Sequence, residues 1–258
     1  MPDYFLAPNH QVITFDGVDA KSFLQSQLTN DVGNLVIGAW QWQGYCNAKG
    51  RLHATFALAR LEENLYAAVV HASVSEFLVK RLTMFRLRSK VLIARSDKFA
   101  LIFHLVEPKQ PVAPPGARLA LGHERWIDID AETLRQVPSA SREAVELWEL
   151  RGIEAMQPEI VAATNERFVP QMLGMDRLTP APGVSFSKGC YPGQEVVARA
   201  HYRGAVKREP ALLNVPLEPA IEPGVEIAQS NGEPAEIVNC VVVGHEWRAL
   251  AVVPIQAS

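Results

Sequence analysis

The residues of this chain that are best suited to chemistry lie between residues 183 and 208. Cys190 stands there among glycines and aromatic residues, with Lys188 two positions before it and Glu195 five positions after it. The glycines and the proline around Cys190 predict a loop, because they supply positive or fixed φ angles. A thiol on a tight turn beside a cation can have a lowered pKa, which favours the thiolate. The alternative is that Cys190 is a small buried apolar residue, and the local chemistry leaves both interpretations open.

Positive charge is concentrated in the same stretch. Between residues 188 and 208 the single acid is Glu195, in a chain whose net charge is only -3. The basic strip consists of Lys188, Arg199, Arg203, Lys207 and Arg208, with His201 and Tyr202 among them. Focused positive charge attracts an anionic small molecule or a nucleic acid. The alternative is a solvated strand edge that is blunted by charge.

Length and composition are those of an ordinary globular protein. The chain has 258 residues, of which 48% are apolar and 21% charged, enough for one large domain or two to three small ones. Its apolar runs are far shorter than the roughly 20 residues that cross a bilayer, and no signal-peptide pattern precedes them. We therefore expect a cytoplasmic protein without a membrane partner. Three widely spaced cysteines, Cys46, Cys190 and Cys240, favour a reducing compartment and argue against a self-contained zinc or iron-sulfur site.

Hydrophobic periodicity predicts an α+β body followed by short β-runs. Strands are expected at residues 11–15, 40–46, 51–61, 65–70, 91–94, 99–105, 118–121, 126–129, 212–215, 225–228, 237–243 and 249–253. Helices are expected after residue 18, after Ser73 as N-cap and after Ser141 as N-cap, and a short strand or helix is expected to begin at Gln194. Four prolines between residues 108 and 116 indicate a linker. The last four β-runs suggest a small barrel or sandwich.

A second basic run lies between Phe77 and Ser96, where no acid occurs. Its six cations are Lys80, Arg81, Arg86, Arg88, Lys90 and Arg95. The run indicates either a solvated face or a second surface that attracts anions. Because the pI is near 6.2 and no stacking motif is present, direct nucleic-acid binding is not expected.

The chemistry-bearing stretch resembles the signature of a known family. The matching segments are residues 168–171 (Phe-Val-Pro-Gln), residues 183–199 with their Lys-Gly-Cys-Tyr-Pro-Gly-Gln-Glu core, residues 202–204, and Lys207-Arg208. They are similar to YgfZ-type folate-binding proteins, which are relatives of the glycine-cleavage aminomethyltransferases and include mitochondrial iron-sulfur assembly factors. Residues 17–31 also resemble the first helix of this family.

The resemblance implies a fold and a cofactor. Family members fold as three modules in a cloverleaf around a central channel, where tetrahydrofolate binds with its pterin inside and its glutamate tail near basic residues. We therefore expect a folate-binding α+β body of two subdomains over residues 1–205, connected near 108–116. A small β-barrel is expected over residues 206–258. The expected cofactor is tetrahydrofolate or a one-carbon derivative.

The resemblance also implies binding residues. In the signature these are Lys188, Tyr191, Gln194, Glu195, Arg199, Tyr202, Arg203, Lys207 and Arg208, where cations suit the carboxylates of the tail. His71 lies at the end of a strand where relatives carry Asn, and an imidazole can donate or accept one hydrogen bond. A histidine that is satisfied locally at the strand end is the alternative. Glu149 is the nearest candidate for the carboxylate that anchors the pterin.

One position departs from the transferases. They place an acid on the strand after the first hairpin turn, and matching their Asn-x-x-Gly turn to residues 47–50 puts this position at Ala54 or Thr55. Neither side chain ionises, so charge that develops on the folate nitrogen would have no fixed counter-charge. Glycine-cleavage chemistry is therefore disfavoured.

The resemblance thus implies an accessory protein more than an enzyme. It would bind reduced folate and support iron-sulfur client proteins or assembly factors, including enzymes that modify transfer RNA. Cys190 would act as a redox-sensitive or transiently ligating thiol. The alternative is a folate-dependent aminomethyl- or methyltransferase or demethylase, which would need an acid or base such as His71 or Glu149 near the pterin.

Overall fold

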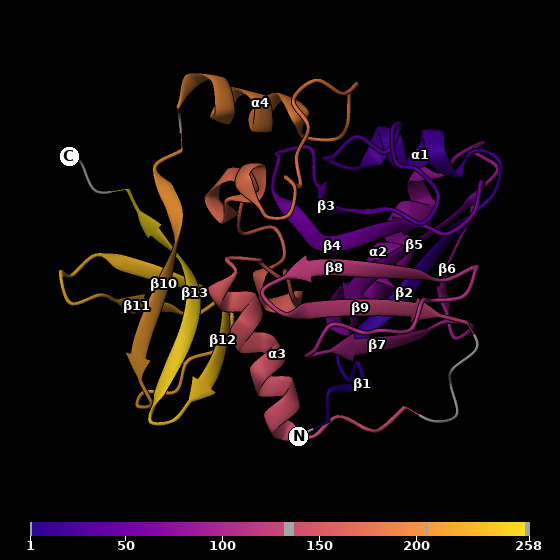
Figure 1. Ribbon diagram of the computed structural model, residues 1–258. Coiled ribbons are helices and arrows are strands. Elements are labelled where there is room, and N and C mark those ends of the chain that lie inside the picture. The colour runs from indigo at the N-terminus through magenta and orange to yellow at the C-terminus, as the bar shows by residue number, and fades with distance from the viewer. Residues whose placement is uncertain (1, 132–136, 205, 256–258) are drawn as a thin grey trace.

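The computed structural model describes residues 2–131, 137–204 and 206–255, apart from the side chain of Arg203 (Figure 1). The strands are β1 Tyr4–Leu6, β2 His10–Asp16, β3 Trp40–Cys46, β4 Leu52–Arg60, β5 Leu65–His71, β6 Leu92–Ser96, β7 Ala100–His104, β8 Ala117–Gly122, β9 Arg125–Asp130, β10 Arg208–Pro216, β11 Glu226–Ala228, β12 Pro234–Val243 and β13 Glu246–Pro254. The helices are α1 Ala20–Gln27, α2 Ala72–Phe85, α3 Arg142–Glu154 and α4 Gln194–Arg203, with the short 3-10 helices η1 Ala162–Thr164, η2 Pro170–Leu173 and η3 Met175–Arg177. An α+β fold is what the sequence predicts.

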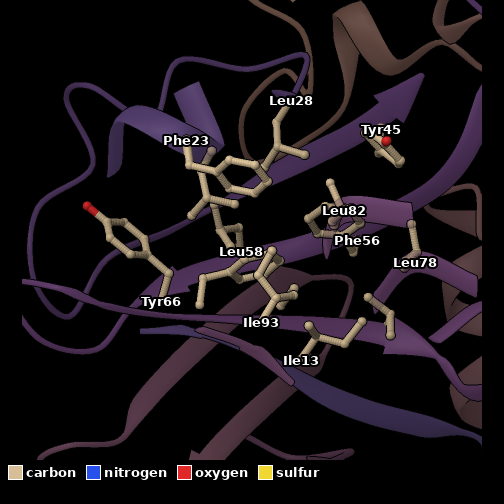
Figure 2. Packing of buried hydrophobic residues seen from close by; sticks show 14 of the residues in the cluster. Ile13, Phe23, Leu28, Tyr45, Phe56, Leu58, Tyr66, Leu78, Leu82 and Ile93 are labelled. Carbon is tan, nitrogen blue, oxygen red and sulfur yellow. The ribbon is translucent and has the colours of Figure 1, made fainter. Parts of the chain in front are cut away.

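The first sheet is antiparallel and is covered on one face by helices. Its strand order is β3-β4-β5-β2-β6. Apolar residues of α1 and α2, such as Phe23 and Leu82, pack with Phe56 and Leu58 of β4 in one core cluster (Figure 2). Eight consecutive residues of β4, 52–59, are buried because the other face of the sheet is covered as well.

The second sheet covers that other face. Its order is β1-β7-β9-β8, and Phe103 and Ile127 of this sheet share a core with Ala57 and Val69 of the first. Helix α3 closes the end of this core with Trp148. Its N-cap is Ser141, as the sequence predicts, and Ser141 Oγ accepts a hydrogen bond from the amide of Ala144 (3.2 Å).

The third sheet contains the C-terminal strands in the order β10-β13-β12-β11. All four predicted β-runs are confirmed as strands. Within the described residues β10 and β11 are the two edges of an open sheet, and closure into a small barrel stays a prediction. In Figure 1, α3 runs between this sheet and the second sheet.

The proline-rich residues 108–116 connect β7 to β8, which both pair with β9. The segment therefore joins two strands of one sheet. The division of the chain into domains at residue 205 stays a prediction.

One helix start differs from the sequence-based expectation. Ser73 is expected to be the N-cap of α2, but the helix begins at Ala72 and its cap is His71. His71 Nδ1 accepts the hydrogen bond of the Ser73 amide (3.2 Å), while Ser73 Oγ accepts one from the amide of Ala162 (3.0 Å). The serine hydroxyl is thus used between segments, and the imidazole takes over the capping.

The loop before α4 packs on the hairpin turn between β3 and β4. Residues 188–193 form a loop, as predicted, and Gln194 begins a helix, which is one of the two predicted alternatives. Gly193 has φ +80°, and a Cβ atom on it would lie 2.6 Å from Gly50 Cα and even closer to the carbonyl oxygen of Asn47. Gln171 Nε2 donates to the carbonyl of Val197 (2.6 Å) and fixes the helix from the other side. In Figure 1, α4 lies at the top of the view, and its buried Val197 shares an apolar cluster with Leu52 of β4 and Leu250 of β13.

We predict that Gly193→Ala destabilises the protein through backbone strain and, in addition, through a steric clash. Gly232 has a similar φ of +82° with nothing near its Cβ position, so it is the matched control. Gly232→Ala should lower the free energy of unfolding by about 1 kcal/mol, the cost of the left-handed conformation. Gly193→Ala should lower it by about 3 kcal/mol, because the turn at residues 47–50 must also move. Urea denaturation measures both, and equal losses in the two variants would contradict the contact described here.

Candidate ligand-binding pocket

A pocket lies where the three sheets meet. Its cavity volume is about 190 Å³, and its lining includes Thr55 of β4, Phe103 of β7, Trp148 of α3 and Asn239 of β12. The rings of Phe103 and Trp148 stack with their centroids 4.0 Å apart and form an apolar wall. An aromatic wall combined with a few polar side chains is typical of sites for flat small molecules.

Residues 157–160 hold the three sheets together at this pocket. Gln157 Nε2 donates to the carbonyl of Leu121 in the second sheet (2.7 Å). In the first sheet, Thr55 Oγ1 donates to the carbonyl of Pro158 (2.8 Å) and accepts from the amide of Ile160 (3.0 Å). Asn239 of the third sheet bonds both the amide and the carbonyl of Glu159 (2.9 Å each). We call residues 157–160 the cross-sheet segment.

The carboxylate of Glu159 points to a histidine across the pocket. His10 Nε2 lies 2.5 Å from Glu159 Oε1, and His10 Nδ1 is buried without a hydrogen-bond partner in the described part of the chain. Burial raises the pKa of Glu159, but the charge and hydrogen bond of His10 outweigh it, so that the pKa lies below its ordinary value. Glu159 is therefore ionised at neutral pH.

Glu149 behaves in the opposite way. Burial, followed by the charge of Glu159, raises the pKa of Glu149 to about 7. The residue is exposed over part of its surface, so solvent screens part of this effect. The pocket thus contains two carboxyl groups with different protonation behaviour, an arrangement that is typical of sites that bind or transfer protons.

His71 has one nitrogen that is used and one that remains for a ligand. Its Nδ1 accepts the capping hydrogen bond of α2, its ring lies 5.7 Å from that of His10, and burial lowers its pKa. A neutral ring that accepts at Nδ1 carries its proton at Nε2. His71 is thus satisfied locally at the strand end, as one of the two alternatives has it, and it also lines the pocket, while its binding role stays a prediction.

The structure distinguishes the two positions at which the transferase acid is missing. Thr55 lines the pocket, whereas Ala54 faces the core between the first sheet and the helices. Both hydrogen-bonding capacities of the Thr55 hydroxyl are taken up by the cross-sheet segment. The hydroxyl group at this position therefore holds the pocket wall in place.

Cys190 is exposed, so the interpretation as a buried core residue is wrong. Lys188, by contrast, is buried, and Nζ donates to the carbonyls of Gln25 (2.7 Å), Leu28 (2.5 Å) and Asn30 (3.1 Å). Burial lowers the pKa of Lys188 to about 8. All three N–H groups of the ammonium are thus committed to the end of α1, and Lys188 is not offered to the thiol as a neighbouring cation.

The remaining predicted residues of the signature lie around α4, outside the pocket lining in the described part of the chain. Tyr191 is buried, Gln194 Nε2 donates to the carbonyl of Lys188 (3.4 Å), and Arg208 pairs with the buried carboxylate of Glu236 (3.0 Å). The exposed residues are Glu195, Arg199, Tyr202 and Lys207. The side chain of Arg203 lies outside the described residues. The structure therefore brings His71 and Glu149 together, and the binding roles of all these residues stay predictions.

The sequence-based predictions missed four charged or titratable residues of the pocket: His10, Arg125, Glu159 and Cys240. Arg125 opens β9, which also contains Asp128 and Asp130, so its charge does not stand out in the sequence. His10 and Glu159 are 149 positions apart and meet only in the folded chain.

Neither a metal site nor a membrane span is found in the part of the chain that the structure describes. No group of three or more His, Cys, Asp or Glu residues in residues 2–131, 137–204 and 206–255 is arranged to hold a metal ion. Over the same residues, no helix combines the length and the apolar character that crossing a bilayer requires.

Comparison with known proteins gives sequence relatives with a shared name. The chain is 32% identical to "tRNA-modifying protein YgfZ" of Vibrio vulnificus (strain YJ016), over 95% of this chain and 76% of the relative. It is 31% identical to the protein of the same name in Aliivibrio fischeri, over 94% of this chain and 82% of the relative. No family model matches the chain.

A solved structure shows the same fold. Glycine cleavage system aminomethyltransferase T from Bartonella henselae superimposes with a TM-score of 0.72, over 97% of this chain and 78% of that one. The sequence identity is 16%, so this likeness concerns the fold alone.

We predict that Glu149 makes stability depend on pH. Since its pKa is about 7 in the folded chain against an ordinary 4.5, the folded state keeps a proton that the unfolded state releases between these values. The free energy of unfolding should therefore fall as the pH rises through this window. Glu149→Gln should flatten this fall, measured by urea denaturation at pH 5, 6, 7 and 8.

Glu143 on the same helix is the control, because its pKa lies below the ordinary value and it titrates outside the window. Glu143→Gln should leave the slope between pH 5 and 8 unchanged. A Glu149→Gln slope equal to that of the unchanged protein would contradict the prediction.

Proposed function

The chain belongs to the YgfZ family, and we propose that it binds tetrahydrofolate or a one-carbon derivative in the pocket and supports the assembly or repair of iron-sulfur enzymes. The clients include enzymes that modify transfer RNA, in keeping with the name of the relatives. The observation that carries the proposal is the pocket itself, a largely apolar cavity at the junction of the three sheets with the carboxyl group of Glu149 in its lining.

The residues present fit the ring of a reduced folate. A pterin is flat, so the stacked rings of Phe103 and Trp148 offer it an apolar wall. Its amino group and ring N–H need a carboxylate, and Glu149 lies in the lining. His71 adds a donor at Nε2. The glutamate tail would extend toward the basic strip, where Arg199 and Lys207 are exposed.

The architecture supports the same proposal. We propose that the three sheets are the three modules of a cloverleaf, with the C-terminal sheet as the small barrel-like module and the pocket as the central channel. The aminomethyltransferase fold of the structural neighbour is consistent with this. Location in the cytoplasm belongs to the proposal, since an exposed free thiol such as Cys190 is kept reduced there.

The second candidate function is catalysis, as a transferase or demethylase with an altered acceptor. It is favoured by the proton-binding groups of the pocket, namely Glu149 with a pKa of about 7 and the His10–Glu159 pair. It is disfavoured by Thr55, whose hydroxyl provides no charge where the transferases have an acid. We therefore place binding before catalysis.

We predict that the purified protein binds 5-formyltetrahydrofolate with quenching of tryptophan fluorescence, since Trp42 and Trp148 line the pocket. Glu149→Gln should weaken binding about tenfold, because a hydrogen bond to a charged group is lost. Glu143→Gln is the control on the same helix and should bind as the unchanged protein does. An absence of binding in the unchanged protein would contradict the proposal. Formation of 5,10-methylene-tetrahydrofolate from tetrahydrofolate and an amine donor would favour the catalytic alternative.

We predict that Cys190 acts outside the pocket. Cys190→Ala should bind 5-formyltetrahydrofolate unchanged but fail to restore iron-sulfur enzyme activity in cells that lack this protein. Ser187→Ala is the control, since Ser187 is an exposed residue of the same loop. Full restoration of activity by Cys190→Ala would show that the thiol is dispensable, and weakened folate binding would show that the loop reaches the ligand.

A further inference from the structure

Arg125 is a buried cation that forms no ion pair with any described residue. The residue is 6% exposed and lines the pocket. The one hydrogen bond of its guanidinium to a described residue goes to Gln157 Oε1, and Nε is buried without any partner. A buried charge is costly unless it is paired and hydrogen-bonded. Some acceptor for this guanidinium is therefore missing from the protein itself.

The side chain of Arg125 packs closely against helix α3, which leaves room for it. The guanidinium lies over the ring of Trp148, with 4.9 Å from Cζ to the ring centroid. On the next turn, a Cβ atom at Gly152 would lie 2.6 Å from Arg125 Nη1. Only a glycine at this position leaves the guanidinium where it is.

The electrostatics of the pocket also favour an acceptor that enters from outside the protein. Desolvation lowers the pKa of Arg125 to about 10, so the group stays charged at neutral pH. Glu159 attracts it, but the carboxylate of Glu159 is hydrogen-bonded to His10. The positive charge thus remains available to an acceptor that enters the pocket.

Glu149 lies on the helix that Arg125 contacts. Glu149 and Gly152 are three positions apart on α3 and so lie on the same face, about 4.5 Å from each other along the helix axis. Arg125 lies against Gly152, and both Arg125 and Glu149 line the pocket, so the pocket presents a donor and a carboxyl group to the same ligand. Such a pair matches a ring edge on which a carbonyl oxygen adjoins an N–H group.

We propose that Arg125 and Glu149 together recognise the 4-oxo, N3–H edge of the bound pterin, with Arg125 donating to the ring carbonyl oxygen. This rests on the proposed function and names the part of the ligand that the pocket selects. A 2-amino-4-oxo ring places its carbonyl on Arg125 and its N–H groups on Glu149. A 2,4-diamino ring places an amino group against the guanidinium and has no hydrogen at N3, so the pocket rejects it.

The test uses two ligands that differ only at this edge, tetrahydrofolate and its 4-amino analogue, tetrahydroaminopterin. Calorimetric or fluorescence titration of the unchanged protein should give a preference for the 4-oxo ligand on the order of 10- to 100-fold, the range of hydrogen bonds to charged groups. Arg125→Gln should lose about tenfold in affinity for tetrahydrofolate and little for the 4-amino analogue. Arg125→Lys, which keeps a charge, should retain part of the preference.

Two further variants test whether the role of Arg125 is merely structural. Gly152→Ala keeps the arginine but displaces its guanidinium, and it should reduce the preference as Arg125→Gln does. Arg151 is the matched control, because it lies on α3 outside the pocket lining and its guanidinium is held by the carbonyls of Leu105 (2.8 Å) and Glu124 (2.9 Å). Arg151→Gln should change stability and leave the ligand preference unchanged. Circular dichroism and urea denaturation identify any variant that does not fold.

The outcomes separate this inference from the proposed function. If the unchanged protein binds tetrahydrofolate and the 4-amino analogue equally well, folate binding stands and the role of Arg125 is overturned. Equal weakening of both ligands by a folded Arg125→Gln variant overturns it too. If neither ligand binds, both proposals fail together. The comparison of the two ligands on the unchanged protein tests the inference even if a variant is unstable.

Discussion

The pocket depends on one constraint, which is that the polar groups of the cross-sheet segment must all find partners in a largely buried place. Residues 157–160 meet this demand by bonding to each sheet in turn, through Leu121, Thr55 and Asn239. A buried amide or carbonyl left unpaired is costly, so these bonds fix the distances between the sheets. The cavity is therefore maintained by hydrogen bonds at its wall, while the apolar cores behind the sheets supply most of the stability.

Local patterns were sufficient to predict most elements of the fold. The strand at Trp40–Cys46, the turn at residues 47–50 and the Ser141 cap depend on neighbours in sequence, and all three are confirmed. The start of α2 was not predicted correctly, because the Ser73 hydroxyl bonds to Ala162, 89 positions away. Strand order and the closure of the third sheet depend on such distant pairings as well, and periodicity carries no information on them.

The candidate site was predictable to a lesser degree. His71 and Glu149 came from a family resemblance, and the structure places both in one pocket. Arg125 and the His10–Glu159 pair could not be found in this way, because their chemistry arises only when three sheets meet. Lys188 is the opposite case, because its position in the sequence suggests a contact that the structure does not show. Its position beside Cys190 suggests an electrostatic neighbour of the thiol, yet three backbone carbonyls take up its ammonium, and burial of this kind has no local signature in the sequence.

The anchoring of the loop at residues 188–193 through Lys188 has a consequence for local opening of the structure. The loop and α4 are tied to the end of α1 and to Gln171, whereas the pocket is tied to all three sheets through residues 157–160. Elements with few anchors open locally, while groups bonded to several sheets are released only when the whole structure opens. The exposed Cys190 thus lies on a segment whose anchoring contacts are separate from those that hold the pocket together.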